Sequence, residues 1–536
     1  MAGIRLFHRK TQQSPTPTGA VAADELITVT VVVRRRSGAN AEADALALGR
    51  LPPGQRKYVR RQDFAAIYGA DRRDLAEVVE KATAHGLEVV GEPSLERRTI
   101  VLRGRADDIG KAFSVTLSEY ELQAGVTYRA PERAIQVPRE LRPLIEGVFG
   151  FDTKPRWGLR SAVVPASAAS ILTVPEAVKR YGFPAELGGH KQCIAILSLG
   201  GGYFKEDLAA FFSGLGFDAA DHPTVVDVSG DGSHNDPQLD PMETTLDIEV
   251  AGAVAPRAHI AVYFGKRDDQ GFISALSKAV HDGRHSPSVI SISFAQAEPD
   301  ASGRVQAAAD QYFVDAALLG VTVCAASGDW GSSGGGSPDG RANVCFPASS
   351  PHVLACGGTM FVHGETRGSH HEVVWNEVAP NGNRGVTGGG VSQTYKRPEW
   401  QKGVNVPKSP NPPPWFRRIF GQVQGHGVPD VAGHAAGFHI YRQGKPTHDA
   451  GTSAVAPLWA GLVALVNEGL GARLGYLNPY LYEEYVNGTL RGAFNDISEG
   501  DNEVPGAPGF HARHGWDPCT GLGSPNGTAL LDALRG

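Results

Sequence analysis

Short, nearly continuous apolar runs alternate with helical stretches through the later part of the chain. Helical segments at 246–255 and 314–320 separate several of these runs. Apolar runs of this kind are typical of buried parallel strands, which lack the alternation of half-exposed ones. The pattern predicts an α/β domain with a doubly wound, mostly parallel sheet, whose sites lie at the carboxyl ends of strands. The runs are 192–199, 224–229, 259–264, 288–293 and 321–327.

The earlier part of the chain has a different pattern, in which amphipathic helices alternate with strands. Two helices packed on an antiparallel sheet in ferredoxin-like order are the simplest arrangement of these segments, so an α+β domain is predicted. The expected strands are 26–36, 87–92, 98–104 and 115–122. The expected helices are 71–86, 106–114 and a final one at 138–151.

Composition along the chain indicates four segments. Residues 1–24 are polar and rich in Pro and Thr, which predicts a flexible tail. Residues 25–151 hold the α+β domain, and 176–536 hold the α/β domain. Between them, 152–175 opens with prolines, small residues and basic residues, which predicts an exposed linker of the kind that proteases cut.

Overall composition is that of a globular protein of two or more domains. The chain has 536 residues, of which 41% are hydrophobic and 20% charged. Acidic residues exceed basic ones by 57 − 51 = 6, which gives no reason to expect a nucleic-acid partner. The five cysteines form neither a disulfide framework nor a CxxC pair, and Cys324 and Cys356 are expected as buried thiols.

Membrane and export signals are not evident in the sequence. No apolar stretch is expected to act as a membrane helix, which needs ~20 residues. The N-terminus is basic but lacks the apolar segment of a standard signal peptide.

The stretch "DAGTSAVAPLWAG" at 449–461 resembles a strand-to-helix turn that presents a serine nucleophile. Ser453 stands at the start of an apolar helical run, where the helix dipole favours a nucleophile. An N-cap serine is an equally good interpretation of this stretch alone. A catalytic serine also needs a base, and none of the 18 histidines lies in a helix of the type that carries a subtilisin base.

A carboxylate pair is the alternative base. Glu243 and Asp247 are four residues apart in "METTLDIEVAGA", so a helix would place them on one face. The neighbouring residues are apolar, which favours a buried helix over a solvated acidic face. Buried carboxyls that share a proton can act as general base and acid at low pH, where histidine would be charged.

With these residues in view, the chain resembles the sedolisin family of serine-carboxyl peptidases, and above all its kumamolisin-like members. The resemblance covers nearly the whole chain, including an N-terminal activation domain. It rests on "GTSAVAP" around Ser453, "ETTLDIEVAGA" around Glu243 and "ASGDWGS" around Asp329. Further matching stretches are 353–359, 387–392, 428–433, 476–482 and 515–525.

The resemblance implies a subtilisin-like fold for the catalytic domain and a role for each matched residue. Ser453 would be the nucleophile, Glu243 the general base and acid, and Asp247 its hydrogen-bonded partner. A protonated Asp329 would donate to the oxyanion together with the Ser453 N–H. Without the resemblance, Asp329 is better explained as a turn residue.

The family also implies how the protein is made. It would be an endopeptidase precursor that cuts its own linker in acid, with the N-terminal domain as folding aid and inhibitor. Proteins and peptides would be its substrates, with no nucleic acid or membrane as partner. A monomer acting outside the cell is expected.

A structural calcium site is implied at the C-terminal end. The stretches "NDISEGDN" (495–502) and "RHGWDP" (513–518) resemble the two halves of the family's calcium loop. Carboxylates and backbone carbonyls suit one Ca²⁺ ion, and a plain acidic surface loop is the alternative. Asp496 and Asp517 would bind the ion through carboxylates, and Ile497, Arg513 and Gly515 through carbonyls.

Three positions depart from the kumamolisin-like pattern. Ser198 replaces a glutamate that extends the hydrogen-bonded chain behind the catalytic acids, and Phe294 replaces the tryptophan beside it. Cys345 stands where an aspartate goes with a preference for basic substrates, so an apolar or broad preference is as well supported. The changes at Ser198 and Phe294 leave the pH optimum open.

Two other functions remain compatible with the sequence. An inactive relative could serve as a binding or scaffold protein, although all four catalytic positions are intact. A conventional subtilisin with an unrecognised histidine is the third possibility, and its activity would rise toward neutral pH.

Overall fold

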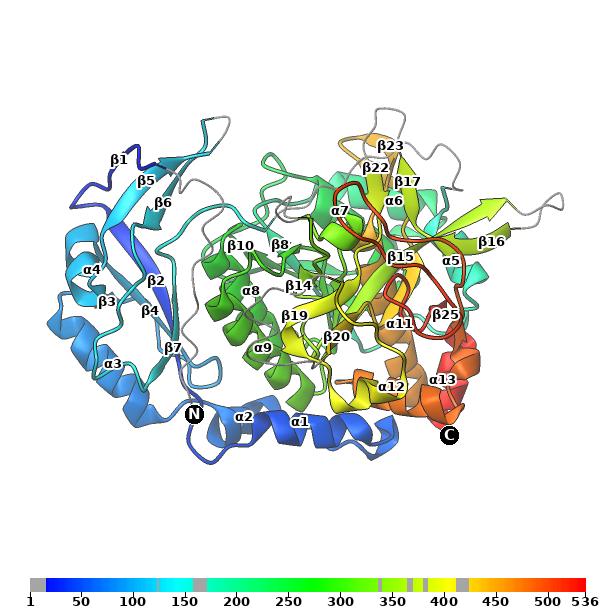
Figure 1. Cartoon of the computed structure of the whole chain (residues 1–536), viewed down its shortest axis with the longest axis horizontal. Coiled ribbons are helices and arrows are strands. Elements are labelled where there is room, and N and C mark those ends of the chain that lie inside the picture. Colours follow the sequence, from blue (N-terminus) through cyan, green and yellow to red (C-terminus); the bar gives the residue numbers. More distant parts are fainter. Residues whose placement is uncertain are drawn as a thin grey trace.

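The computed structural model describes residues 16–122, 125–157, 171–335, 340–363, 370–378, 384–410 and 424–536. An N-terminal α+β region lies beside a larger α/β region (Figure 1). The first region is built on a four-stranded antiparallel sheet in the order β3-β4-β2-β7. These strands are β2 (Leu26–Val33), β3 (Glu88–Val89), β4 (Thr99–Arg105) and β7 (Ile145–Phe149).

Two helices cover this sheet, α3 (Arg72–Ala84) and α4 (Ala106–Phe113). Leu75 of α3 and Ile109 of α4 share a buried core with Val31 of β2. Numbered along the chain, the four strands take the spatial order 2-3-1-4. This is the ferredoxin-like order, so the fold expected for the N-terminal domain is confirmed.

The helix expected at 138–151 is wrong. Its second half is the edge strand β7, in which Val148 pairs with Val31 of β2. Pro143 lies in the middle of the segment and cannot donate the backbone hydrogen bond that a continuous helix needs.

Two further elements of this region differ from expectation. The strand expected at 87–92 is reduced to the two residues of β3. Strand β5 (Leu117–Glu121) leaves the main sheet and pairs with β6 (Thr127–Pro131) and β1 (Gly19–Ala20). Part of the expected flexible tail therefore belongs to a sheet, while residues 1–15 lie outside the described residues.

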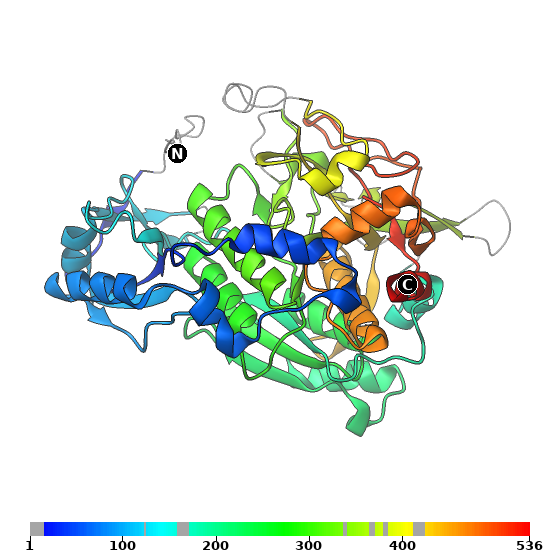
Figure 2. The same ribbon diagram turned by 90° about the horizontal axis from the view of Figure 1, so that it is seen from below.

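Two helices that the sequence analysis missed join the two regions, α1 (Ala41–Arg50) and α2 (Arg61–Tyr68). They lie between β2 and α3 in the chain, and Figure 2 shows α1 running across the helices of the α/β region. Arg56, just after α1, donates to the carbonyl oxygen of Tyr476 at 2.9 Å. These helices thus fasten the N-terminal region to the α/β region, in addition to the contacts that β2 and β7 make with α8 and α9.

The α/β region is built on an eight-stranded sheet in the order β16-β15-β13-β11-β8-β10-β9, with β21 also paired to β15. All pairs are parallel except β15 with β16, which confirms the mostly parallel sheet. The strands are β8 (Cys193–Leu199), β9 (Val225–Ser229), β10 (His259–Gly265), β11 (Val289–Ile292), β13 (Thr322–Ala326), β15 (Leu354–His363), β16 (His370–Val374) and β21 (Val431–His434).

Helices cover both faces of this sheet, and the strands alternate between two cores. Ile194 and Ile196 of β8 face the core shared with α7 and α11, whereas Ala195 and Leu197 face the core shared with α8 and α9. Strands buried on both faces explain the unbroken apolar runs of the sequence. The helices are α6 (Lys205–Gly214), α7 (Met242–Val254), α8 (Asp269–His281), α9 (Gly303–Leu318) and α11 (Thr452–Leu470).

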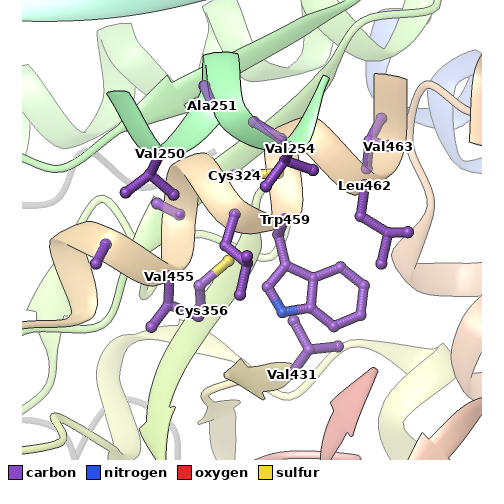
Figure 3. Packing of buried hydrophobic residues seen from close by; sticks show 14 of the residues in the cluster. Val250, Ala251, Val254, Cys324, Cys356, Val431, Val455, Trp459, Leu462 and Val463 are labelled. Atoms are coloured by element: carbon purple, nitrogen blue, oxygen red, sulfur yellow. The ribbon is translucent and has the colours of Figure 1, made fainter. Parts of the chain in front are cut away.

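Helix α11 forms the centre of one core. Figure 3 shows Trp459 of α11 among Val254 of α7, Val431 of β21 and the buried thiols Cys324 and Cys356. By length and composition α11 could cross a membrane, contrary to the expectation that no stretch would, yet 83% of its apolar window is buried inside the protein. The helix is therefore explained by its place in the core.

The remaining helices and strands of the α/β region lie outside its eight-stranded sheet. They are α5 (Val174–Arg180), β12 (Gln296–Ala297) with β14 (Cys345–Phe346), β17 (Asn376–Val378) with β18 (Arg384–Val386), β19 (Gly390–Lys396) with β20 (Gly425–Val428), β22 (Phe438–Arg442) with β23 (Lys445–Asp449), α12 (Asn478–Asn487), β24 (Phe494–Asn495) with β25 (Ser524–Pro525), and α13 (Gly527–Arg535).

Candidate active site

Ser453 is the second residue of α11, and the helix N-cap is Gly451, which makes no side-chain cap. The N-cap interpretation of Ser453 is therefore wrong. Its Oγ is buried and has no hydrogen-bond partner, so no histidine of the described residues pairs with it. Gly451 has φ of 142°, and a Cβ there would lie 2.8 Å from Asp329 Oδ2 and 3.4 Å from Ser453 Oγ. Glycine thus leaves free the space toward which both side chains point.

Glu243 and Asp247 lie one turn apart on α7, which packs against α11. Both side chains are buried, and neither oxygen of Glu243 has a hydrogen-bond partner. Asp247 Oδ1 accepts from Ser293 Oγ at 2.7 Å, and the same hydroxyl lies 3.2 Å from the Ser453 carbonyl oxygen. Ser293, at the end of β11, therefore ties the acid-bearing helix to the serine-bearing helix.

Burial raises the pKa of both acids well above their ordinary values. For Glu243 the nearby carboxyls of Asp247, Asp449 and Asp329 raise the pKa further. The nearby Ser453 hydroxyl lowers the pKa of Glu243 to a smaller extent, although the two groups do not form a well-shaped hydrogen bond. A pair in this environment retains a proton at pH values where exposed carboxyls have lost theirs.

Asp329 follows β13 and reaches α11. Its Oδ1 accepts from the N–H and from the Oγ1 of Thr452, each at 2.8 Å. These bonds join residues 123 positions apart, so Asp329, which lies in a bend after the strand, also makes contacts across the fold. Burial raises its pKa to about 6, against the lowering effect of the two bonds from Thr452. Below that pH the carboxyl is protonated and can donate a hydrogen bond.

The structure places the three departures around this set. Ser198, at the end of β8, bonds through Oγ to Thr244 Oγ1 at 2.7 Å and so reaches α7 beside Glu243. The ring of Phe294 lies 6.0 Å below the guanidinium of Arg267. Cys345 is a buried free thiol. Ser198 thus extends the hydrogen-bonded chain to a threonine and not to a catalytic acid.

A fourth buried carboxyl at the site, Asp449, was missed by the sequence analysis. It ends β23, four positions before Ser453, and Arg442 of β22 holds its Oδ2 at 2.9 Å. Burial raises its pKa to about 6. Its position before the serine was the only sequence signal, because its effect on Glu243 and Asp329 depends on contacts across the fold.

The two halves of the expected calcium loop lie against each other. Asp496 accepts from the N–H of Gly515 at 3.1 Å, and Asp517 accepts from the N–H of Arg513 at 3.2 Å. Asp517 is buried, which raises its pKa to about 6, and Ile497 is buried as well. Among the described residues no group of three or more His, Cys, Asp or Glu could hold a metal. A site of two carboxylates and backbone carbonyls is of a different kind, and Asp496 and Asp517 supply the oxygen donors that calcium prefers.

Comparison with known proteins shows the family to which the chain belongs. Residues 15–154 match the family described as the pro-kumamolisin activation domain. Over 96% of its length the chain is 45% identical to a curated serine-carboxyl peptidase and covers 93% of it. The chain therefore belongs to the sedolisin family of serine-carboxyl peptidases, as a serine-type endopeptidase with a prodomain.

The relative just described is kumamolisin from Bacillus sp. (strain MN-32). Sedolisin from Pseudomonas sp. (strain 101) is 28% identical over 98% of this chain and 89% of its own length. A solved structure of Pseudomonas sedolisin, complexed with two molecules of pseudo-iodotyrostatin, has a TM-score of 0.59 at 27% identity. The match covers 69% of this chain and 99% of the Pseudomonas sedolisin chain, which supports the subtilisin-like fold of the peptidase region.

Proposed function

We propose that this peptidase acts in acid through Ser453, Glu243, Asp247 and Asp329. The observation that supports this most strongly is the buried, unpartnered carboxyl of Glu243 beside Asp247 and Ser453. Ser453 Oγ attacks the scissile carbonyl carbon, and its proton passes to Glu243. Glu243 then gives a proton to the leaving amine, which departs and leaves an acyl-enzyme on Ser453. Water hydrolyses the acyl-enzyme with Glu243 again as base.

Asp247 and Asp329 have distinct parts in this scheme. Asp247 keeps one unpartnered oxygen, Oδ2, with which it can share a proton with Glu243. One shared proton leaves one carboxylate to act as base, even in acid. Asp329 donates to the oxyanion from Oδ2, and the N–H of Ser453 is the second donor. That N–H belongs to the first turn of α11, where backbone donors lack partners inside the helix.

The N-terminal domain is proposed as an intramolecular inhibitor and folding aid that is removed by self-cleavage. The expected linker is 152–175, of which 158–170 lie outside the described residues. Its two flanks are bound to the peptidase region: the Arg156 N–H donates to the Arg267 carbonyl at 3.0 Å, and the Leu172 N–H to the Gly437 carbonyl at 3.0 Å. Because both flanks are held, we propose that the cut falls between Trp157 and Leu172.

An ion cluster fixes the prodomain on the peptidase region. Asp315 of α9 binds Arg35 at 2.6 Å and Arg98 at 2.9 Å, and both arginines come from the prodomain. Burial alone would raise the pKa of Asp315, but the charges of Arg98 and Arg35 hold it below its ordinary value. A depressed pKa means that the stabilisation persists as the pH falls through the ordinary range of aspartate. We therefore propose that acid activates the precursor through cleavage of the linker and not through loss of this cluster.

A structural role for calcium is proposed at Asp496, Ile497, Arg513, Gly515 and Asp517. A bound Ca²⁺ would cross-link the two chain segments through hard oxygen ligands and would take no part in the reaction. We also propose that the peptidase acts outside the cell as a monomer.

Self-cleavage is tested by incubating purified full-length protein at pH ~4, where model carboxyls are partly protonated. Wild type should yield a shorter chain, and Ser453→Ala should stay full length. Ser291→Ala is the matched control, because Ser291 is also buried without a hydrogen-bond partner and lies outside the proposed catalytic set. Ser453→Ala protein that is trimmed as fast as wild type would reject self-cleavage and favour an inactive scaffold protein.

A further inference from the structure

Trp157 occupies an aromatic pocket of the peptidase region. It is the last described residue before the proposed cut and is fully buried. Its ring stacks on Phe272 of α8, with centroids 3.9 Å apart and an angle of 24° between the planes. Phe346 of β14 lies 6.2 Å away, and the indole Nε1 donates to Asp269 Oδ1 at 3.3 Å. All three partners belong to the peptidase region, so the pocket stays with the enzyme when the prodomain leaves.

The pocket is linked to the catalytic residues by a series of contacts. The backbone of Arg156, next to Trp157, bonds to the Arg267 carbonyl. The side chain of Arg267 lies over the ring of Phe294, which directly follows Ser293. Ser293 in turn donates to Asp247. A chain segment that places an aromatic side chain in the pocket is therefore connected, through Arg267 and Phe294, to Ser293, the residue that bonds to Asp247 of α7.

The surroundings of Trp157 have the features of a recognition site. Stacked aromatic rings and an indole N–H with a partner are the combination that satisfies both the apolar face and the polar edge of tryptophan. Once Trp157 departs, the rings of Phe272 and Phe346 lose this cover. An aromatic side chain of another peptide can restore it, and its backbone can meet the carbonyl of Arg267 as Arg156 does.

We propose that this pocket, formed by Phe272, Phe346 and Asp269, binds an aromatic side chain of the substrate on the N-terminal side of the scissile bond. The side is given by chain direction, because Trp157 precedes the proposed cut. Tryptophan is favoured over phenylalanine, since only indole can donate to Asp269. The inference rests on the proposed function, and it assigns Trp157 as the occupant that the substrate replaces.

The test uses the full-length protein after processing in acid, separated from its prodomain. One tryptophan is moved through a set of otherwise identical peptides, from the first to the fifteenth residue before the cleaved bond, the range that a cut between Trp157 and Leu172 allows. One position should raise kcat/KM at least about tenfold over alanine, mainly through KM, because the pocket holds ground state and transition state alike. Phenylalanine at that position should give a smaller gain.

Variants separate the pocket from the catalytic set. Phe272→Ala should remove the gain and leave hydrolysis of the alanine peptides unchanged, whereas the control Phe217→Ala, in another part of the core, should keep it. Asp269→Ala, which does not open the core, should remove the advantage of tryptophan over phenylalanine. It therefore keeps the test decisive if Phe272→Ala fails to fold.

Three results would overturn the inference. If the alanine peptides are cleaved and no position of tryptophan raises kcat/KM, the pocket is only an anchor for the prodomain while the proposed function stands. If N-terminal sequencing shows that the processed chain keeps Trp157, the pocket is not vacated. If no peptide is cleaved at all, the proposed function fails and this inference fails with it.

Discussion

Replacing Asp329 separates an acidic oxyanion donor from an ordinary amide donor. Asp329→Ala removes the proposed donor, which typically lowers kcat by about 10²–10³ and corresponds to about 2.7–4 kcal/mol. Asp329→Asn keeps an oxygen for the two bonds from Thr452 and offers an amide N–H where Oδ2 stands. The amide donates at every pH, whereas the carboxyl donates only while protonated.

The pH dependence follows from the raised pKa of Asp329, about 6. At pH 4 about 99% of this carboxyl is protonated, and at pH 7 about a tenth, so the wild-type kcat should fall roughly tenfold per unit above pH 6. In Asp329→Asn this fall should disappear or move to the pKa of another group. KM should change less than kcat in both variants, because the donor is aimed at charge that develops in the transition state.

The assay is kcat against pH from 3 to 8 on enzyme that has already been processed, so that activation does not confound the rates. Thr452→Val is the companion variant, since it removes one bond to Asp329 and keeps the carboxyl. Two outcomes would refute the reasoning. Asp329→Ala with wild-type kcat would end the oxyanion role, and Asp329→Asn with an unchanged fall near pH 6 would assign that fall to another group.

Three further predictions concern the pH dependence of kcat and the stability of the protein. Asp449→Asn should move the alkaline fall of kcat to lower pH, because the Asp449 charge raises the pKa of Glu243 and Asp329; an upward shift would contradict this. Chelation should lower the thermal midpoint of wild type but not of Asp496→Ala, since an ion at 100 times its Kd stabilises the folded protein by about 2.7 kcal/mol. The control Asp532→Ala should respond like wild type. A wild-type midpoint that does not change on chelation would remove the calcium proposal. Arg98→Met should lower the free energy of unfolding of the precursor by about 3–5 kcal/mol, because it leaves the buried charge of Asp315 with fewer partners. Denaturant unfolding measures this change, and Arg105→Met, at an exposed arginine, is the control. Equal unfolding midpoints for Arg98→Met and wild type would mean that the cluster is not a major anchor.

The sequence predicts the parts of the fold that follow from local periodicity. Apolar runs identified the parallel strands because those strands are buried on both faces, as β8 is. The spacing of Glu243 and Asp247 placed both acids on one helical face, as α7 does. In the segment 138–151 the same reasoning failed. Leu141, Leu144 and Val148 have helical spacing, but pairing with β2 and the proline between them decide the structure.

What the sequence could not predict are contacts made across the fold. Asp329 looks like a turn residue until its bonds to Thr452 are seen. Asp449 and Trp157 carry no motif, and their surroundings come from α7, α8 and β13. The pairing of Arg98 with Asp315 joins positions 217 residues apart. Such interactions depend on packing, which no local spacing encodes.

The most direct test of the central claim is to follow acylation of Ser453 by mass spectrometry during turnover of a peptide ester at pH ~4. For the processed enzyme, the account predicts a covalent adduct on the peptide that contains Ser453. In Glu243→Gln, which cannot take the proton, the adduct should form about 10²–10⁴ times more slowly. An adduct on any other residue, or one that forms at the wild-type rate in Glu243→Gln, would contradict it.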